Sequence, residues 1–571
     1  MDKLHDQNVQ QPSSAEGISE SRASMDSHKQ NDDQNHKLSF TELVRADYDL
    51  QTRSERLRLD ITDIPIHHNK KLGQTTLPVD IQYQPGKGRF LVARRDISAG
   101  ELIFRESPLL LAPKSASDPA CLACLKAVDA NYALCKNCKG PLCSSGCHGN
   151  GHSEEECRLI KGLGLQERSN FRMNFRELSL LLAPLRVYLL MNESPVAKEV
   201  FQALQSHKER RKMMPIGRYV EEKIVKVFQD QLALDVDSSL VHHICGVLDT
   251  NAYEVSIDDS SRARAIFTLT SMLNHSCLPN TQRWYADGKM IIRAATDIPK
   301  GVPVTTTYTQ TLWGTGTRLA HLSTCKMFTC VCNRCSDPTE LGSHLSSISC
   351  KSCQSPDGLL IPPQTSDMPW RCYKCEAQVP SNAIQAMVRA SSAILSKVDM
   401  QSTEEVTATL KHLSRMLGRQ HYIVAELKLG MIQSIMRLPF REDVSNDDLI
   451  RVMDLSEELL SLAELIEPEL SRFRGLLLLQ SGQAYLELLK RQRNSRENIV
   501  SLSKPNKSSC GNGLTSGIIM SKEYIKEMLG RMAECEFILL YDQRLPEVLE
   551  VMEHMREFLY TGDTEEFSAA E

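Results

Sequence analysis

The chain contains 571 residues, which allows three or four domains at roughly 150 residues each. Its 67 Lys and Arg residues nearly balance its 72 Asp and Glu residues, so the net charge of -5 excludes a strongly basic nucleic-acid-binding coat. The first residues, MDKLHDQNVQQ, lack the apolar core of a secretory signal, and no run reaches the ~18 apolar residues that cross a bilayer. We therefore expect an intracellular chain with no membrane attachment.

The first half of the chain alternates between polar, strand-like and helical patterns. Residues 1–38 are rich in Gln, Asn, Asp, Ser and His and predict a disordered tail, and the spacing of apolar residues predicts a helical lead-in over 39–75. Residues 76–120 carry short apolar and β-branched runs between glycines, which predict a small antiparallel sheet. A cysteine cluster at 121–157 interrupts this sheet, and the segment 158–240 has helical spacing.

Strand patterns return in the second half before the chain becomes helical. Residues 241–325 include ADGKMIIRAATDI, in which the Asp-Gly pair predicts a hairpin. Two cysteine-rich segments follow at 326–340 and 341–380. Residues 381–571 are rich in Leu, Met, Glu and Ala at helical spacing and predict an all-α lobe of antiparallel helix pairs. The fold class is therefore α+β.

The 19 cysteines are interpreted as metal ligands, because disulfides are rare in reducing compartments. The first cluster supplies seven thiolates and one imidazole, which fill two tetrahedral zinc sites and leave no open position. Filled shells indicate a structural role. His148 competes with His152 as the imidazole ligand, and His152 is preferred because it repeats the paired spacing. The eight ligands are Cys121, Cys124, Cys135, Cys138, Cys143, Cys147, His152 and Cys157.

Two further groups of cysteines predict two more zinc ions. The group Cys330, Cys332 and Cys335 needs a fourth ligand, for which Cys277 is the preferred candidate and Cys325 the competitor. The last group has the two-knuckle spacing of a zinc ribbon and consists of Cys350, Cys353, Cys372 and Cys375. The sequence thus predicts four zinc ions. The cysteines left over are expected to be reduced thiols: Cys245, Cys325, Cys510 and Cys535.

Several motifs in a fixed order carry a family resemblance: GKGRFLVARRDISAGELIF, the eight-ligand cluster, LTSMLNHSCLPN, Tyr308 and CVCNRC. Over residues 76–340 the chain resembles the SMYD family, in which a MYND zinc finger splits a SET methyltransferase domain. The continuation through Cys375 resembles the arthropod-specific, SmydA-like branch. The resemblance implies a β-rich SET domain with an inserted MYND finger and helical insert, a post-SET zinc site, a zinc ribbon and the all-α C-terminal lobe.

The family implies methyl transfer from S-adenosylmethionine to a lysine of a protein, histone or non-histone. Tyr308 matches the family's catalytic tyrosine, whose hydroxyl lies at the methyl-transfer point and positions and polarises the reacting groups. The family pattern also places Tyr308 among the residues that line the cofactor site. The other residues that match cofactor-binding positions are Lys87, Gly88, Asn251, Asn274, His275 and Phe328. Read alone, Asn274 and His275 would indicate a turn and Phe328 would suit a core equally well.

Three positions depart from the family pattern. The acidic pair before the catalytic tyrosine is absent from GVPVTTTY, and Pro85 stands where relatives often carry a basic residue. Lys326 replaces an aromatic residue of the lysine channel. Its ammonium either points into the channel and opposes a protonated substrate, or it snorkels to solvent with only its stem packed.

The resemblance also sets expectations about partners. We expect a protein substrate with a target lysine, a proline-rich peptide at the finger, a role in gene regulation, a monomer, and a location in cytoplasm and nucleus. Direct binding to nucleic acid is not expected, because the net charge is negative and the run from His207 to Lys212 is typical of a solvated helix face. The alternative is a catalytically weak scaffold that acts as a corepressor or binds proline-rich motifs.

Overall fold

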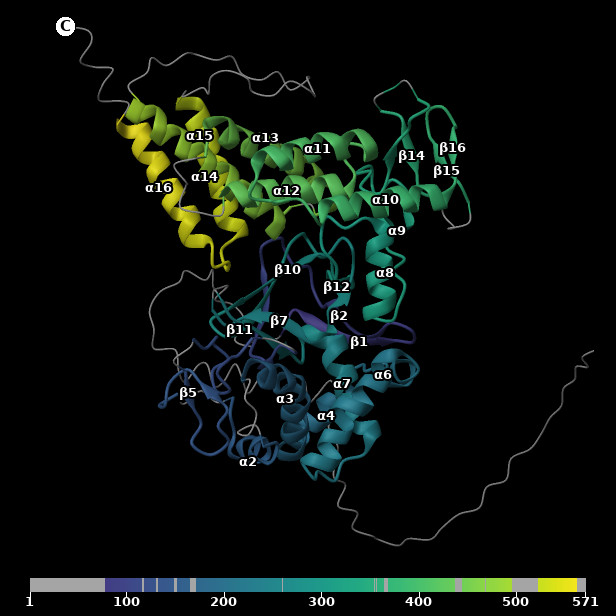
Figure 1. Cartoon of the computed structure of the whole chain (residues 1–571). Coiled ribbons are helices and arrows are strands. Elements are labelled where there is room, and N and C mark those ends of the chain that lie inside the picture. Colours follow the sequence, from purple (N-terminus) through teal and green to yellow (C-terminus); the bar gives the residue numbers. More distant parts are fainter. Residues whose placement is uncertain are drawn as a thin grey trace, which may run out of the picture. The chain divides into compact units, whose positions relative to one another are not determined.

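The computed structural model describes most of the chain from residue 77 onward (Figure 1). The predicted tail and helical lead-in lie outside the described residues, as do His148 and Cys510. The described ranges are 77–115, 118–129, 132–147, 151–164, 171–258, 260–353, 355, 357–363, 368–436, 444–467, 469–495 and 522–561. None of the helices in these ranges is both long and apolar enough to span a bilayer.

Segments far apart in the sequence pair in three small sheets, with strand orders β1-β2-β12-β9, β10-β11-β3 and β4-β8-β7. The strands are β1 Val79–Gln84, β2 Gly88–Ala93, β3 Leu102–Glu106, β4 Leu110–Pro113, β7 Tyr253–Ser256, β8 Arg262–Ile266, β9 Asn274–His275, β10 Thr281–Ala286, β11 Lys289–Ala294 and β12 Pro303–Thr306. The predicted hairpin joins β10 to β11 through Asp287 and Gly288, both at positive φ, as a tight primed turn requires. These sheets share one buried apolar core.

Between β4 and β7 the chain forms the finger and the helical insert. The finger carries the short strands β5 Ala133–Leu134 and β6 Pro141–Leu142, and it leads into helix α2 Glu154–Gly162. The insert contains α3 Phe171–Glu193, α4 Pro195–Ala203, α5 Lys208–Lys212, α6 Pro215–Val220, two π-helical turns at Glu221–Val225 and Val227–Gln231, and α7 Ser238–Asn251.

The basic run on α5 is not the fully solvated face that the sequence predicts. Arg211 is buried and forms an ion pair with Asp249. The other basic residues of α5 stay at least partly exposed. A buried arginine needs a partner, and that partner comes from the distant helix α7, which no local pattern reveals.

The cysteine-rich region before residue 380 and the helical lobe after it share one apolar core. After α8 Thr315–Cys325 and α9 Asn333–Ser336, a four-stranded antiparallel sheet is formed by β13 Ile348–Ser349, β14 Leu359–Ile361, β15 Trp370–Cys372 and β16 Gln378–Val379. The lobe follows with α10 Ser381–Leu395, α11 Thr403–Leu417, α12 Tyr422–Met436, α13 Asn446–Ile466, α14 Arg472–Ser495, α15 Lys522–Ile538 and α16 Leu545–Thr561. Leu345, Ile348 and Leu360 of the ribbon region belong to the same apolar core as these helices.

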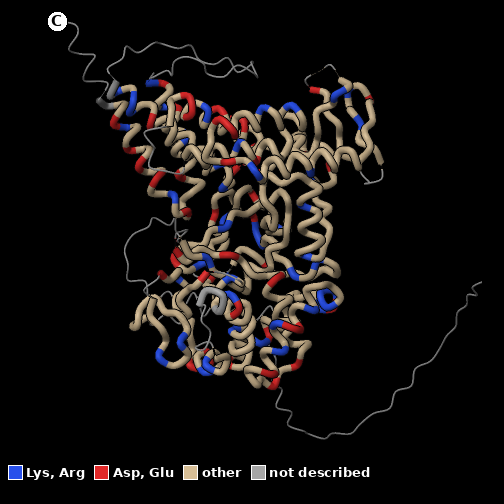
Figure 2. The backbone as a smooth tube through the Cα atoms, in the orientation of Figure 1, with Lys and Arg blue, Asp and Glu red and all other residues tan. Residues whose placement is uncertain are grey.

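The α+β architecture predicted from the sequence is confirmed, with the described strands lying before residue 380 and an all-helical carboxy-terminal lobe after it (Figure 1). Figure 2 shows basic and acidic residues interspersed along the described backbone. This distribution agrees with the nearly balanced composition.

Candidate functional site

The finger brings its eight predicted ligands together as two interleaved groups. Cys121 and Cys124 meet Cys143 and Cys147, whereas the second group consists of Cys135, Cys138, His152 and Cys157. In each group the ligand atoms lie within 4.8 Å of one another. The Sγ–Sγ distances of 3.7 Å for Cys121–Cys147 and 3.6 Å for Cys135–Cys157 match the roughly 3.8 Å edge of a tetrahedron with Zn–S bonds of about 2.3 Å. Both groups therefore fit zinc.

A buried carboxylate orients the histidine of the second group. His152 Nδ1 bonds Glu156 Oε1 at 2.8 Å, which turns Nε2 toward the sulfur of Cys138 at 3.4 Å. Such carboxylate–histidine pairs fix the ring and the tautomer of a zinc ligand. His152, the preferred imidazole in the sequence, thus lies among the ligands, and the carboxylate that aims it was missed.

Arg186 of α3 connects the His152–Glu156 pair to strand β4. Its guanidinium donates to Glu156 Oε2 at 2.6 Å, to the Leu111 carbonyl of β4 at 3.0 Å, and to the Leu122 carbonyl in the finger at 2.8 Å. Both side chains of the ion pair are almost fully buried. The only sequence signal was an arginine inside an apolar helix, because its partners are remote in sequence.

The post-SET group assembles as the preferred assignment predicts. Cys277 joins Cys330, Cys332 and Cys335, and its sulfur lies 3.4 Å from that of Cys335. The competitor Cys325 is exposed and lies outside the group. One metal ion here would tie the loop after β9 to the segment that follows α8.

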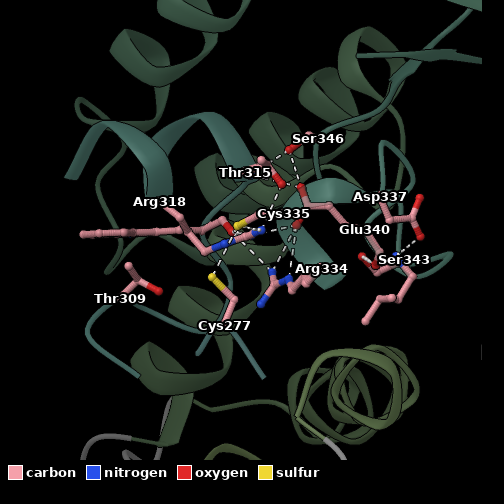
Figure 3. A network of polar contacts seen from close by, with 12 residues as sticks. Cys277, Thr309, Thr315, Arg318, Arg334, Cys335, Asp337, Glu340, Ser343 and Ser346 are labelled. Carbon is pink, nitrogen blue, oxygen red and sulfur yellow. Dashed lines mark hydrogen bonds and ion pairs between the residues drawn. The ribbon is translucent and has the colours of Figure 1, made fainter. Parts of the chain in front are cut away.

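A buried ionic network surrounds this group (Figure 3). Arg318 Nη2 donates to Cys335 Sγ at 3.6 Å, and Arg318 Nη1 lies 2.7 Å from Glu340 Oε2. Arg334 pairs with the same carboxylate, which also accepts from the backbone N–H of Thr315. Burial favours a neutral carboxyl, yet the two guanidinium groups hold the pKa of Glu340 below its ordinary value. Arg318 offsets part of the negative charge that four thiolates leave around a divalent ion.

The ribbon group differs from the prediction at one position. Cys350, Cys372 and Cys375 converge, with Cys350 Sγ 3.6 Å from Cys375 Sγ, but Cys353 is not among them. The Cys353 sulfur packs against Gly358, where an added Cβ would lie 2.7 Å from it. The described residues thus bring together three of the four predicted ribbon ligands.

Tyr308, the predicted catalytic residue, lies just after β12 and is held by two hydrogen bonds. Its hydroxyl donates to the Leu273 carbonyl at 2.6 Å, and its backbone N–H donates to His275 Nδ1 at 3.0 Å. Because Nδ1 accepts, the ring proton sits on Nε2, which faces the Cys277 sulfur at 3.1 Å. Burial lowers the pKa of His275 to about 4, so the ring is neutral near pH 7. His275 therefore links a metal ligand to the tyrosine.

The remaining predicted cofactor residues are distributed around this centre. Phe328 packs against His275 with ring centroids 6.0 Å apart, and Asn274 pairs with Thr305 between the parallel strands β9 and β12. The other three are less central. Lys87 and Gly88 lie at the β1–β2 turn of the same sheet, and Asn251 donates to the carbonyls of Gln205 and Val247. Their binding role stays a prediction.

The acidic pair missing before Tyr308 is replaced by neutral contacts. Asn280 Oδ1 accepts from the Thr305 backbone N–H at 2.7 Å, and its amide donates to the Pro303 carbonyl at 2.8 Å. Arg283 donates to the Thr306 hydroxyl at 2.7 Å. Pro303 has no backbone N–H to donate within β12, and the side chain of Asn280, which sequence reasoning missed, supplies hydrogen bonds at this part of the strand.

Lys326 turns inward and does not snorkel to solvent. Its Nζ donates to the Thr250 carbonyl at 2.6 Å and lies 5.4 Å from the centroid of the Tyr308 ring. Burial lowers the pKa of this ammonium group.

A cavity of about 360 Å³ lies beside Ala252 and Tyr253, and none of the predicted cofactor residues lines it.

Comparison of the sequence with known proteins shows the family to which the chain belongs. Residues 88–309 match the SET domain model. SET domain-containing protein SmydA-8, isoform A, from Drosophila melanogaster is 31% identical over 66% of this chain and 82% of its own length. Histone-lysine N-methyltransferase ASHR1 from Arabidopsis thaliana is 27% identical over 44% of this chain and 54% of its own, and Histone-lysine N-methyltransferase SMYD3 from Homo sapiens is 25% identical over 44% and 59%. The chain belongs to the SMYD family of SET-domain proteins and resembles its SmydA members.

Proposed function

We propose that this chain transfers a methyl group from S-adenosylmethionine to the ε-amine of a lysine in a protein. The observation that carries the proposal is Tyr308, fixed by Leu273 and His275 at the end of β12 inside a matched SET domain. Two of the relatives are named lysine methyltransferases, which supports the same reaction class.

The tyrosine is suited to orient an amine. Its O–H is donated to the Leu273 carbonyl, so the phenol oxygen is left to accept an N–H from the target lysine. Burial raises the pKa of Tyr308, which keeps the phenol protonated and that hydrogen bond in place. S-adenosylmethionine supplies the activated methyl group when it is bound. The chain must then present the lysine, with an ordinary pKa near 10.4, as a neutral amine in line with that methyl group.

The zinc groups support this site from outside it. The two finger groups and the post-SET group each bring four protein ligands together and leave no open position for a substrate, so their ions would act structurally. The post-SET group would hold His275 and Phe328 beside Tyr308 through Cys277 and Cys330. We propose that Asn274, Phe328 and the backbone of His275 hold the cofactor.

The partners and location are part of the same proposal. A protein with an accessible lysine is the substrate class, and the finger offers a site for a proline-rich peptide. We propose a monomer in cytoplasm and nucleus with a role in gene regulation. The location is supported by the cysteines assigned as metal ligands, which need reducing conditions to stay thiolates.

One observation favours the alternative of a weakly catalytic scaffold. Lys326 sits on the Tyr308 ring, at a position where relatives often carry an aromatic residue. The charge would oppose a protonated substrate lysine and lower turnover.

Methyl transfer from isotope-labelled S-adenosylmethionine to histones and to whole cell extract tests the proposal. Acid hydrolysis of the labelled proteins should yield methyl-lysine. Binding of the cofactor without any labelled lysine would favour the scaffold, and absence of cofactor binding would contradict the enzyme.

A further inference from the structure

The backbone conformation around Lys326 fixes the direction of its side chain. It caps α8, where its N–H donates to the Leu322 carbonyl at 3.0 Å. Met327 then takes a positive φ of 62°, and Phe328 N–H returns to the same carbonyl at 3.3 Å. Arg210 from α5 holds the Met327 carbonyl at 3.2 Å. The turn is therefore pinned on both sides, and the side chain extends toward Tyr308.

The groups that receive Lys326 are those that bind an alkylammonium. Thr250 lies in the last turn of α7, where carbonyls lack partners within the helix and the helix dipole favours a cation. The face of the Tyr308 ring, 5.4 Å from Nζ, supplies a cation–π contact. Among the described residues, no carboxylate forms a salt bridge with Lys326. The direct contacts that the described residues make with this cation are thus a carbonyl and an aromatic face, while the charges of Asp249, Arg264 and Arg283 act on it from a greater distance.

We propose that Lys326 occupies, over the face of the Tyr308 ring, the approach by which the ε-amine of a target lysine reaches the phenol oxygen. This inference rests on the proposed function, because it identifies Tyr308 as the residue that meets the target lysine. Lys326 Nζ already fills the space between the Thr250 carbonyl and the ring face, and two ammonium groups a few ångströms apart repel one another. A protein substrate must therefore displace Lys326 to reach the site.

Lys326→Met isolates this effect, because methionine keeps an unbranched apolar stem of similar length and removes the ammonium group. Lys300→Met is the matched control, since Lys300 is exposed in the turn before β12. The probe is Nα-acetyl-lysine N-methylamide, which carries a free ε-amine. Its binding is measured by titration calorimetry or ligand-observed NMR. Lys326→Met should bind the probe about tenfold more tightly than wild type, which corresponds to losing one competing cation–π and hydrogen-bonded contact.

Equal affinities of wild type, Lys326→Met and Lys300→Met for the probe would overturn the inference. A second measurement uses the unmodified protein and does not depend on how a variant folds. Under trace acetylation, Lys326 should react at least tenfold more slowly than Lys300, and saturating probe should accelerate its reaction. A Lys326 rate that equals the Lys300 rate, or that the probe leaves unchanged, would also overturn the inference.

These readouts separate the inference from the proposed function. If the probe displaces Lys326 but no protein is methylated, the proposed position of Lys326 is supported and the proposed methyltransferase activity is contradicted. If proteins are methylated but the affinity for the probe does not depend on Lys326, the activity is supported and the proposed position of Lys326 is contradicted.

Discussion

At the scale of single residues, His275 connects the post-SET metal ligand Cys277 to the predicted catalytic residue Tyr308, which the sequence did not predict. The family resemblance implies that His275 helps to bind cofactor, but its ring nitrogens are engaged by the Tyr308 backbone and the Cys277 sulfur. The imidazole therefore acts as a positioning group. Removing its hydrogen bonds should disturb Tyr308 while leaving the four thiolates of the post-SET group in place.

His275→Phe tests this role, because it keeps a ring and removes both hydrogen bonds. We expect the variant to lose about 1–3 kcal/mol of unfolding free energy, the usual cost of an unpaired buried N–H. Zinc content should stay at the wild-type value. Denaturant unfolding and metal analysis measure the two quantities, and His554→Phe on the exposed face of α16 is the control. Equal losses at both positions would contradict a special role for His275.

Cys277 and Cys325 form a matched pair for the post-SET ion. Cys277→Ser should release one zinc ion and weaken cofactor binding, because the ion anchors the loop that carries Asn274 and His275. Cys325→Ser should change neither quantity, since Cys325 is exposed and outside the group. Metal analysis and cofactor titration report the outcome, and the reverse pattern would show that the fourth ligand is misassigned.

The spacing of the ribbon cysteines predicts Cys353 as a zinc ligand, but the structure places its sulfur outside the group. A closed zinc site needs four ligands, and Cys353 is three residues from Cys350 on the same knuckle. We expect its side chain to rotate away from Gly358 and complete the shell when metal binds. Cys353→Ser should then reduce the zinc content from four ions to about three. An unchanged content would show that another group completes the site.

At the scale of elements, the finger is joined to the SET sheet more closely than an insertion needs to be. The sequence predicts that losing Cys121 or Cys138 unfolds the finger and leaves the SET core partly able to bind cofactor. Arg186 gives a physical path between them, because one guanidinium bonds β4, the finger backbone and the carboxylate that aims His152.

Arg186→Met should be strongly destabilising, because it leaves the buried carboxylate of Glu156 without its partner. The expected loss is about 3–5 kcal/mol, typical of breaking a buried pair. Arg158→Met, which breaks the solvent-exposed pair with Glu155, should cost far less, because water screens that pair. Denaturant unfolding and the rate of zinc loss to a chelator compare the two variants. Similar costs would mean that the buried pair does not couple finger and sheet.

At the scale of the whole molecule, local patterns predicted the elements and the metal ligands well. Short apolar and β-branched runs between glycines predicted the small sheet that includes β2 and β3, and the Asp-Gly pair predicted the β10–β11 hairpin. The need of a closed zinc site for a fourth ligand pointed to Cys277, which lies in the post-SET group. These features depend on neighbouring residues or on the fixed needs of a zinc shell.

The contacts that assemble the site could not be predicted in this way. Glu340 meets Arg318 across 22 residues, Arg186 meets Glu156 across 30, and Lys326 meets Thr250 across 76. Such pairs depend on how elements pack, and one sequence carries no local signal for them. The two π-helical turns before α7 were likewise expected as ordinary helix, because an apolar repeat does not distinguish i+4 from i+5 bonding.

The most direct test of the central claim is the rate of methyl transfer by Tyr308→Phe beside wild type. The substitution removes one hydroxyl and keeps the ring, and Tyr83→Phe on the exposed strand β1 is the matched control. We predict that Tyr308→Phe lowers transfer to protein lysines about 10- to 100-fold, in the range for one positioned polar group, with little change in cofactor affinity. Transfer by Tyr308→Phe at the rate of wild type and of Tyr83→Phe would contradict the account.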